Sequence, residues 1–116
     1  MTVKELIERT GFSPICEGDL TREIQSVYCC DMLSIAMGRA PADSAWVTVM
    51  GNVNSVAVGA LADVSCILYA EGVQPDAECK TRAAQQGITL LGADLPVFDA
   101  ALKIHQHLLA REDEAL

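Results

Sequence analysis

The sequence alternates short β-rich segments with segments of helical pattern, and this alternation limits the possible folds more than any other feature. The β-rich segments cover residues 12–16, 24–30, 45–50, 64–70 and 88–91, and from residue 24 onward they begin roughly twenty residues apart. This spacing is typical of βαβ units, in which helices join parallel strands. Because the predicted strands are apolar almost throughout, we expect helices on both faces of the sheet. We therefore predict an α/β single-domain three-layer sandwich with a mostly parallel sheet of about five strands flanked by helices.

Capping residues mark where the predicted helices begin. Thr2 followed by Glu5 forms a capping-box pattern. Asp31 and Asp94 are predicted N-caps of the second and the last helix, and Pro75 is predicted to occupy the first position of the helix that precedes the last one. The last helix is expected to run past residue 109. We predict that its inward face carries an apolar stripe with one histidine, made of Phe98, Leu102, His105 and Leu109.

Length and charge restrict the class of protein. The chain has 116 residues, and we predict that residues 1–110 form one domain and residues 111–116 an acidic tail. A formal net charge of −8 argues against nucleic acid and anionic membrane surfaces as partners. Neither a membrane span nor a signal peptide is recognisable, so we expect the protein in the cytoplasm.

Signatures of catalysis and of metal binding are missing from the sequence. It contains no GxxxxGK[ST] phosphate loop, no GxGxxG motif and no GxSxG nucleophile elbow. Its five cysteines include a neighbouring pair, Cys29 and Cys30, whose side chains should point to opposite faces of a strand. The spacing of the cysteines favours reduced, mainly buried thiols over a metal site. We expect no catalytic residue, no metal and no cofactor.

The loops that follow the predicted strands are the candidate binding site. In an open parallel sheet, ligands bind beyond the carboxyl ends of the strands, where the following helices present free backbone amides. A Gly-Asn-x-Asn loop after the central strand combines backbone freedom with amide donors and acceptors. Each residue could equally serve only as a cap or a turn. The predicted ligand-binding residues are Asp31, Gly51, Asn52, Asn54, Gly72 and Asp94.

Four segments of the chain resemble the DRTGG domain family. They are residues 27–34 (VYCCDMLS), residues 46–58 (WVTVMGNVNSVAV), residues 66–75 (CILYAEGVQP) and residues 87–91 (GITLL) followed by Phe98. The eponymous Asp-Arg-Thr-Gly-Gly string is absent, so the chain is similar to the divergent, stand-alone members. Related domains form the N-terminal half of HPr serine kinase, where catalysis lies elsewhere. The resemblance implies a regulatory or dimer-forming role rather than kinase activity.

These observations lead to two main functional hypotheses. The first is a non-catalytic regulatory domain that senses a nucleotide or another small anion at the strand ends. The second is an interaction domain that forms a homodimer or serves as a scaffold for a larger metabolic or redox enzyme, through an apolar surface containing Met32, Met37 and Trp46. A homodimer is expected because closed two-fold dimers are the commonest assemblies. A thiol enzyme based on Cys29 and Cys30 is the third, least supported alternative.

Overall fold

Five strands form one sheet in the order β1-β5-β4-β3-β2, in a computed structural model that describes the backbone of residues 1–115 and the side chains of residues 1–110. The strands are β1 (Ser13–Cys16), β2 (Ser26–Cys29), β3 (Ser44–Thr48), β4 (Cys66–Tyr69) and β5 (Thr89–Gly92). Strands β2 to β5 pair in parallel, and β1 pairs antiparallel with β5. The predicted α/β fold is therefore confirmed, with an antiparallel strand at one edge.

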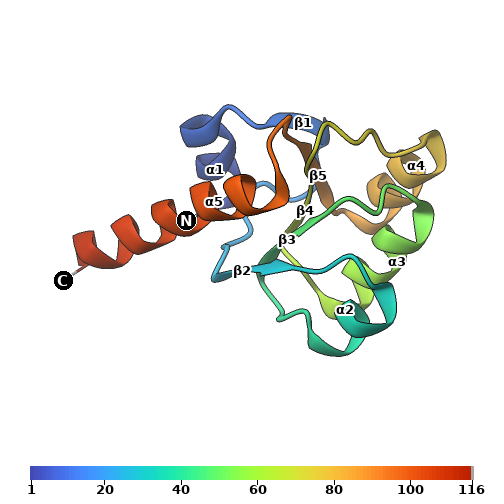
Figure 1. Cartoon of the computed structure of the whole chain (residues 1–116), viewed down its shortest axis with the longest axis horizontal. Coiled ribbons are helices and arrows are strands. Elements are labelled where there is room, and N and C mark those ends of the chain that lie inside the picture. The colour runs from blue at the N-terminus through green and yellow to red at the C-terminus, as the bar shows by residue number, and fades with distance from the viewer. Residues whose placement is uncertain (116) are drawn as a thin grey trace.

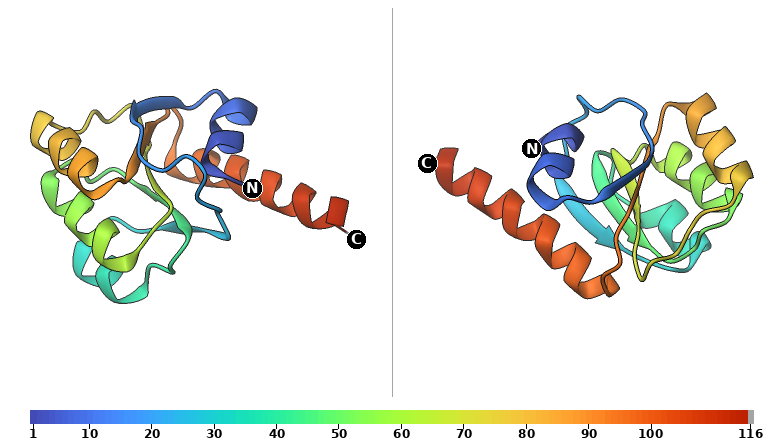
Figure 2. Two further views of the ribbon diagram at one scale, coloured as in Figure 1. Left: turned by 180° about the vertical axis from the view of Figure 1, so that it is seen from behind. Right: turned by 90° about the horizontal axis from the view of Figure 1, so that it is seen from above.

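Helices cover both faces of this sheet. The crossover helices α2 (Leu33–Arg39), α3 (Val53–Ala62) and α4 (Ala77–Gln86) lie on one face, and α1 (Val3–Thr10) and α5 (Val97–Ala115) lie on the other (Figure 1). Because β2 to β5 follow one another in sequence order, successive crossovers of one hand place all three helices on the same side. Figure 2 shows the same layers from behind and from above.

Two apolar cores lie on the two faces of the sheet, and alternate residues of each strand contribute to them. In β3, Ala45 and Val47 point toward α1 and α5, whereas Trp46 points toward the crossover helices. Trp46 is fully buried, and its indole Nε1 donates to the carbonyl of Cys30 at 3.0 Å. The predicted apolar surface is therefore wrong for Trp46, but Met32 and Met37 are 58% and 49% exposed.

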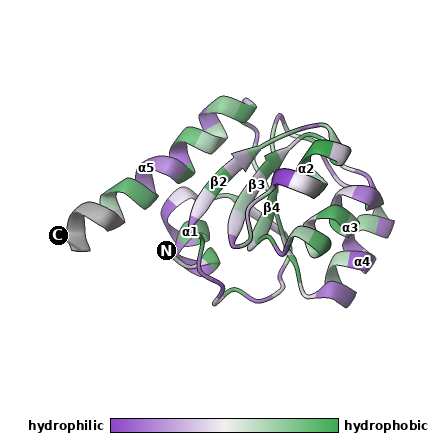
Figure 3. Cartoon of the chain, turned by 90° about the horizontal axis from the view of Figure 1, so that it is seen from below, coloured by the Kyte–Doolittle hydropathy of each residue, from purple (hydrophilic) through white to green (hydrophobic). Residues whose placement is uncertain are grey.

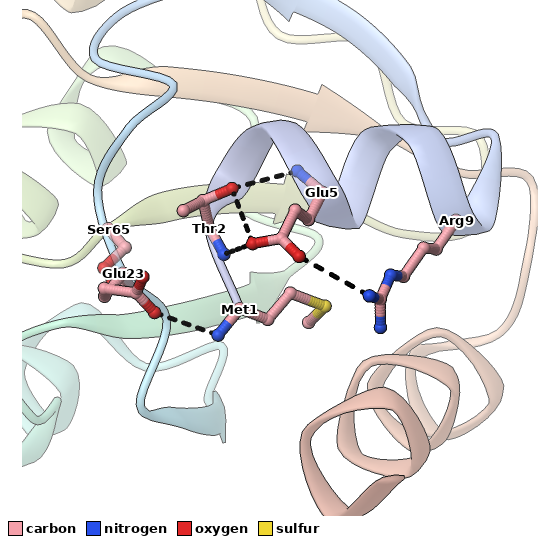
Figure 4. Close-up of polar contacts among 6 residues, drawn as sticks. All are labelled: Met1, Thr2, Glu5, Arg9, Glu23 and Ser65. Atoms are coloured by element: carbon pink, nitrogen blue, oxygen red, sulfur yellow. Dashed lines mark hydrogen bonds and ion pairs between the residues drawn. The ribbon is translucent and has the colours of Figure 1, made fainter. Parts of the chain in front are cut away.

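The N-terminal turn contains the predicted capping box. The Thr2 hydroxyl accepts from the backbone amide of Glu5, and the Glu5 carboxylate accepts from the amide of Thr2, both at 3.1 Å (Figure 4). The N-terminal ammonium group of Met1 forms an ion pair with Glu23, whose carbonyl accepts from the hydroxyl of Ser65. These contacts attach α1 to the segment that leads into β2.

Three predicted helix starts are wrong. In each case, either the predicted capping residue bonds elsewhere or another side chain accepts a hydrogen bond at the start of the helix. Asp31 lies before Met32, the N-cap of α2, and its carboxylate instead accepts from the Thr48 hydroxyl and the Val49 amide, both at 2.9 Å. Helix α4 is capped by Asp76, so that Pro75 lies just outside it. Helix α5 begins three residues after Asp94, at Val97, and the Val97 amide donates to the Glu71 carboxylate.

Helix α5 is rotated relative to the prediction. Its buried residues are Ala100, Ala101 and Ile104, whereas His105 is exposed and Phe98 is 70% exposed. The helix carries two apolar stripes, and the stripe with small residues allows the closer approach to the sheet. The backbone of residues 111–115, part of the predicted acidic tail, continues α5, and the side chains of the tail lie outside the described residues. No helix in the described part of the chain is long and apolar enough to cross a membrane.

Candidate functional site

The six predicted ligand-binding residues lie at the end of the sheet where the carboxyl ends of β2 to β5 meet, because these four strands are parallel. They form two groups rather than one site. Asp31, Gly51, Asn52 and Asn54 lie at the ends of β2 and β3, and Gly72 and Asp94 lie at the ends of β4 and β5. The strand order does not reverse between β2 and β5, so this part of the sheet end lacks the crevice found at a topological switch point.

The Gly-Asn-x-Asn loop uses its own polar groups for structure. Asn52 is the N-cap of α3, and its side-chain oxygen accepts from the amide of Asn54 at 2.9 Å. The carbonyl of Gly51 accepts from the amide of Asp76 at 3.3 Å and from the thiol of Cys79 at 3.5 Å. These contacts engage the Asn52 side-chain oxygen and the Gly51 carbonyl, and they attach the loop to the start of α4.

A buried cluster of polar side chains lies on the interior side of the Gly-Asn-x-Asn loop. The hydroxyls of Ser55 and Tyr69 lie 2.8 Å apart, and the Cys79 thiol lies beside Gly51. Burial, the largest cause, and the nearby Asp76 carboxylate raise the pKa of the Cys79 thiol to about 11. Burial also raises the pKa of Tyr69. The Cys79 thiol and the Tyr69 hydroxyl therefore stay protonated near neutral pH, and they stabilise the loop rather than supply a nucleophile.

The second group of predicted residues borders a cavity of about 390 Å³. Three elements enclose it: β1, the β4–α4 connection with the first turns of α4, and the end of β5. Its lining residues are Ser13, Pro14, Ile15, Gly72, Gln74, Lys80, Gly92, Ala93 and Asp94. The cavity lies where antiparallel β1 follows β5, which is the place along the sheet where strand direction changes.

Gly72 shapes the floor of this cavity. It adopts a left-handed conformation with φ of 71°, directly after Glu71, whose φ is 59°. The amides of Glu71 and Gly72 donate to the carbonyls of Leu95 and Ala93 at 2.8 and 3.1 Å. A Cβ atom at Gly72 would lie 3.0 Å from Oδ1 of Asp94. Glycine therefore allows the two loops to approach and leaves the Asp94 carboxylate at the cavity wall.

Two opposite charges stand on the cavity wall. Lys80 comes from α4 and Asp94 from the loop after β5. Among the described residues, neither side chain has an ion-pair or hydrogen-bond partner. The Lys80 backbone lies against β1, where its carbonyl accepts weakly from the Cys16 thiol at 3.9 Å. The cavity therefore offers one cationic and one anionic group for a ligand.

The sequence did not indicate Lys80 as a binding residue. Its position on α4 is typical of a solvated basic residue, and only the packing of α4 against β1 brings it to the cavity. No local motif connects residue 80 with residue 13 or residue 92. The sequence indicates Asp94 and Gly72 because they follow strands, and both line the same cavity as Lys80.

Within the described residues, no group of three or more His, Cys, Asp or Glu side chains could hold a metal ion. No protein-family model matches the chain, and no curated protein sequence is significantly similar to it. Any functional interpretation therefore depends on the geometry of the chain itself.

Proposed function

We propose that this chain is a non-catalytic regulatory domain that binds a small metabolite in the cavity between β1, α4 and the loops after β4 and β5. The observation that carries the proposal is the pair of charges Lys80 and Asp94 on the wall of one cavity, neither of which has an ion-pair or hydrogen-bond partner among residues 1–110. The role is of the kind implied by the resemblance to DRTGG domains, and both that relationship and a cytoplasmic location remain part of the proposal.

The charges on the wall define the ligand class. The Lys80 ammonium group suits one anionic group, and the Asp94 carboxylate suits an amine or hydroxyl donor. A polyphosphate, as in a nucleotide, fits less well because Asp94 would repel it. In addition, the side chains of Asn52 and Asp76 already bond amides in the first turns of α3 and α4. A small anion that also carries a hydrogen-bond donor is the better match.

The lining residues favour binding over catalysis. They include neither histidine nor cysteine, and Ser13 is the only hydroxyl among them. A serine hydroxyl is a weak nucleophile unless an adjacent base oriented toward it activates it. We therefore assign Lys80 and Asp94 to recognition.

A thermal-shift experiment tests this proposal. Amino acids, hydroxy acids, sugar phosphates and nucleotides would be added to the wild-type chain and to Lys80→Met, with exposed Lys4→Met as the matched control. A ligand at about a hundred times its Kd stabilises by roughly 2.7 kcal/mol, which corresponds to several degrees for a domain of this size. We expect a shift in wild type and Lys4→Met that Lys80→Met loses. A flat response across all four classes, or a shift that Lys80→Met retains, would overturn the proposal.

An interaction domain is the second candidate function, and a separate observation favours it. Phe98, Leu102 and Leu109 are 70%, 38% and 45% exposed on one side of α5, and on the other face of the sheet the N-cap Met32 and Met37 of α2 are exposed. Clustered exposed apolar side chains often mark sites where another protein binds. In this role the chain would form a homodimer or dock on a larger metabolic or redox enzyme.

A further inference from the structure

The edge of the sheet at β2 is the starting point of a further inference. On one side β2 pairs with β3, and in the part of the chain that the structure describes its other side has no partner strand. Helix α5 packs against β2 and then extends past the sheet (Figures 1 and 2). Edge strands with open hydrogen-bonding groups readily accept another chain unless they are covered.

An apolar groove of about 280 Å³ lies between β2 and α5. Its lining residues are Val27, Cys29, Phe98, Ala101, Leu102 and His105. None of these six residues is acidic, although the whole chain carries a formal charge of −8. The groove is therefore a place where two copies of this acidic chain can meet without direct repulsion between carboxylates.

The exposed stripe on α5 has the spacing of a helix–helix contact. Phe98, Leu102, His105 and Leu109 follow one another at intervals of four, three and four residues. This spacing matches the a and d positions of a heptad, whose side chains pack into spaces on a facing helix. The stripe that packs on the sheet is a different one, with Ala100, Ala101 and Ile104. Figure 3 shows apolar segments recurring along α5.

The projecting side chain and the groove belong to one surface of one chain. Phe98 is 70% exposed at the rim of the groove, and the groove volume exceeds that of an aromatic side chain. In a two-fold interface the same patch meets itself, so that residue i contacts residue j and residue j contacts residue i. A patch with both a projecting ring and a groove beside it satisfies this condition.

We propose that two copies of this chain associate about a two-fold axis through the face formed by β2 and α5, with Phe98 of each copy in the groove of the other. With the axis perpendicular to α5, the two α5 helices run antiparallel, and Leu102 extends the contact along them. This inference rests on the second candidate function and is independent of ligand binding at Lys80.

Light scattering coupled to size-exclusion chromatography, over a range of concentrations, tests this inference on the full chain. Phe98→Glu places a charge at the centre of the contact, and Leu61→Glu is its matched control. Leu61 lies on α3 in the opposite helix layer and is 71% exposed, against 70% for Phe98. We expect wild type and Leu61→Glu at twice the chain mass of 12.4 kDa and Phe98→Glu at 12.4 kDa.

Several outcomes would overturn the inference. One is a wild-type chain that stays monomeric at high micromolar concentration, and another is a Phe98→Glu dimer as stable as that of wild type. Circular dichroism checks that the variants fold, and Leu102→Glu replaces Phe98→Glu if that variant unfolds. A monomeric wild type that binds a different protein through Phe98 would overturn the homodimer but keep the interaction role.

Discussion

The hydroxyl groups of Ser55 and Tyr69 lie 2.8 Å apart in the interior and join the first turn of α3 to the end of β4. Ser55 donates its own proton to the carbonyl of Asn52 at 2.7 Å, so the proton between the two hydroxyls comes from Tyr69. This chain of bonds holds the Gly-Asn-x-Asn loop in place. The loop is thus fixed from inside the protein.

The direction of these bonds predicts unequal effects of two substitutions. Ser55→Ala removes the acceptor of a buried hydroxyl and should lower the free energy of unfolding by about 1–3 kcal/mol. Tyr69→Phe leaves Ser55 bonded to Asn52 and should cost only about 0.5–1.5 kcal/mol. The double variant should be no less stable than Ser55→Ala, because the two residues act as one unit. Urea unfolding measures all three variants. A Tyr69→Phe loss as large as that of Ser55→Ala would contradict this bond direction, and strictly additive losses would contradict the coupling.

Arg22 is expected to contribute more to stability than an ordinary surface arginine. Its guanidinium group donates to the carboxylates of Asp43 at 2.6 Å and Asp63 at 2.9 Å, and both aspartates have a left-handed backbone with φ of 61°. Lysine lacks the planar fork that bridges two carboxylates. Arg22→Lys should therefore lower the free energy of unfolding by about 1–2 kcal/mol.

Arg9→Lys is the control for Arg22→Lys. Arg9 lies 3.5 Å from Glu5 in a single helical pair, and such pairs contribute about 0.3–0.5 kcal/mol. Its effect on urea unfolding should stay within about 0.5 kcal/mol. Equal effects of the two substitutions would show that bridging by Arg22 has no special role.

Alkaline pH should destabilise the fold through a buried thiol. Burial raises the pKa of Cys66 from the ordinary value of 9.0 to about 12. Between about pH 9 and pH 12 the unfolded chain then loses this proton while the folded chain keeps it. Stability is therefore fully present below pH 9 and falls by about 1.4 kcal/mol per pH unit above it for such a group. Urea unfolding should show a smaller decrease in Cys66→Val, and an identical pH dependence would contradict this assignment.

The strands could be predicted from sequence because their signals are local. The five β-rich segments coincide with β1 to β5 within a few residues, and the Thr2–Glu5 capping box forms as expected. Strand order could not be predicted, because it depends on contacts between distant segments. The orientation of α5 was predicted wrongly for a related reason. The helix has two apolar stripes, and the sequence does not show that Ala100 and Ile104, rather than Phe98 and Leu102, meet the sheet.

The residues of the candidate cavity differ in how far the sequence indicates them. Strand ends indicate which loops share an edge, and this was sufficient to select Gly72 and Asp94. The sequence does not show that the side chains of Asp31 and Asn52 accept hydrogen bonds from Thr48 and Asn54. Lys80 reaches the cavity only through the packing of α4 on β1, so tertiary structure was needed to find it.

Gly18 is the glycine at which substitution should cost the most stability, because its backbone lies close to the backbone of Gly87. A Cβ atom there would overlap the carbonyl of Gly87, and the Gly18 amide donates to the hydroxyl of Thr89 at 3.0 Å. Gly18→Ala should lower the free energy of unfolding by about 1–3 kcal/mol, because backbone cannot yield as a side chain does. Gly38→Ala, in an exposed turn of α2 with open space around it, should raise stability by up to about 1 kcal/mol. Thermal unfolding should therefore move the two variants in opposite directions, and a Gly18→Ala chain as stable as wild type would show that the segment before β2 does not pack on Gly87.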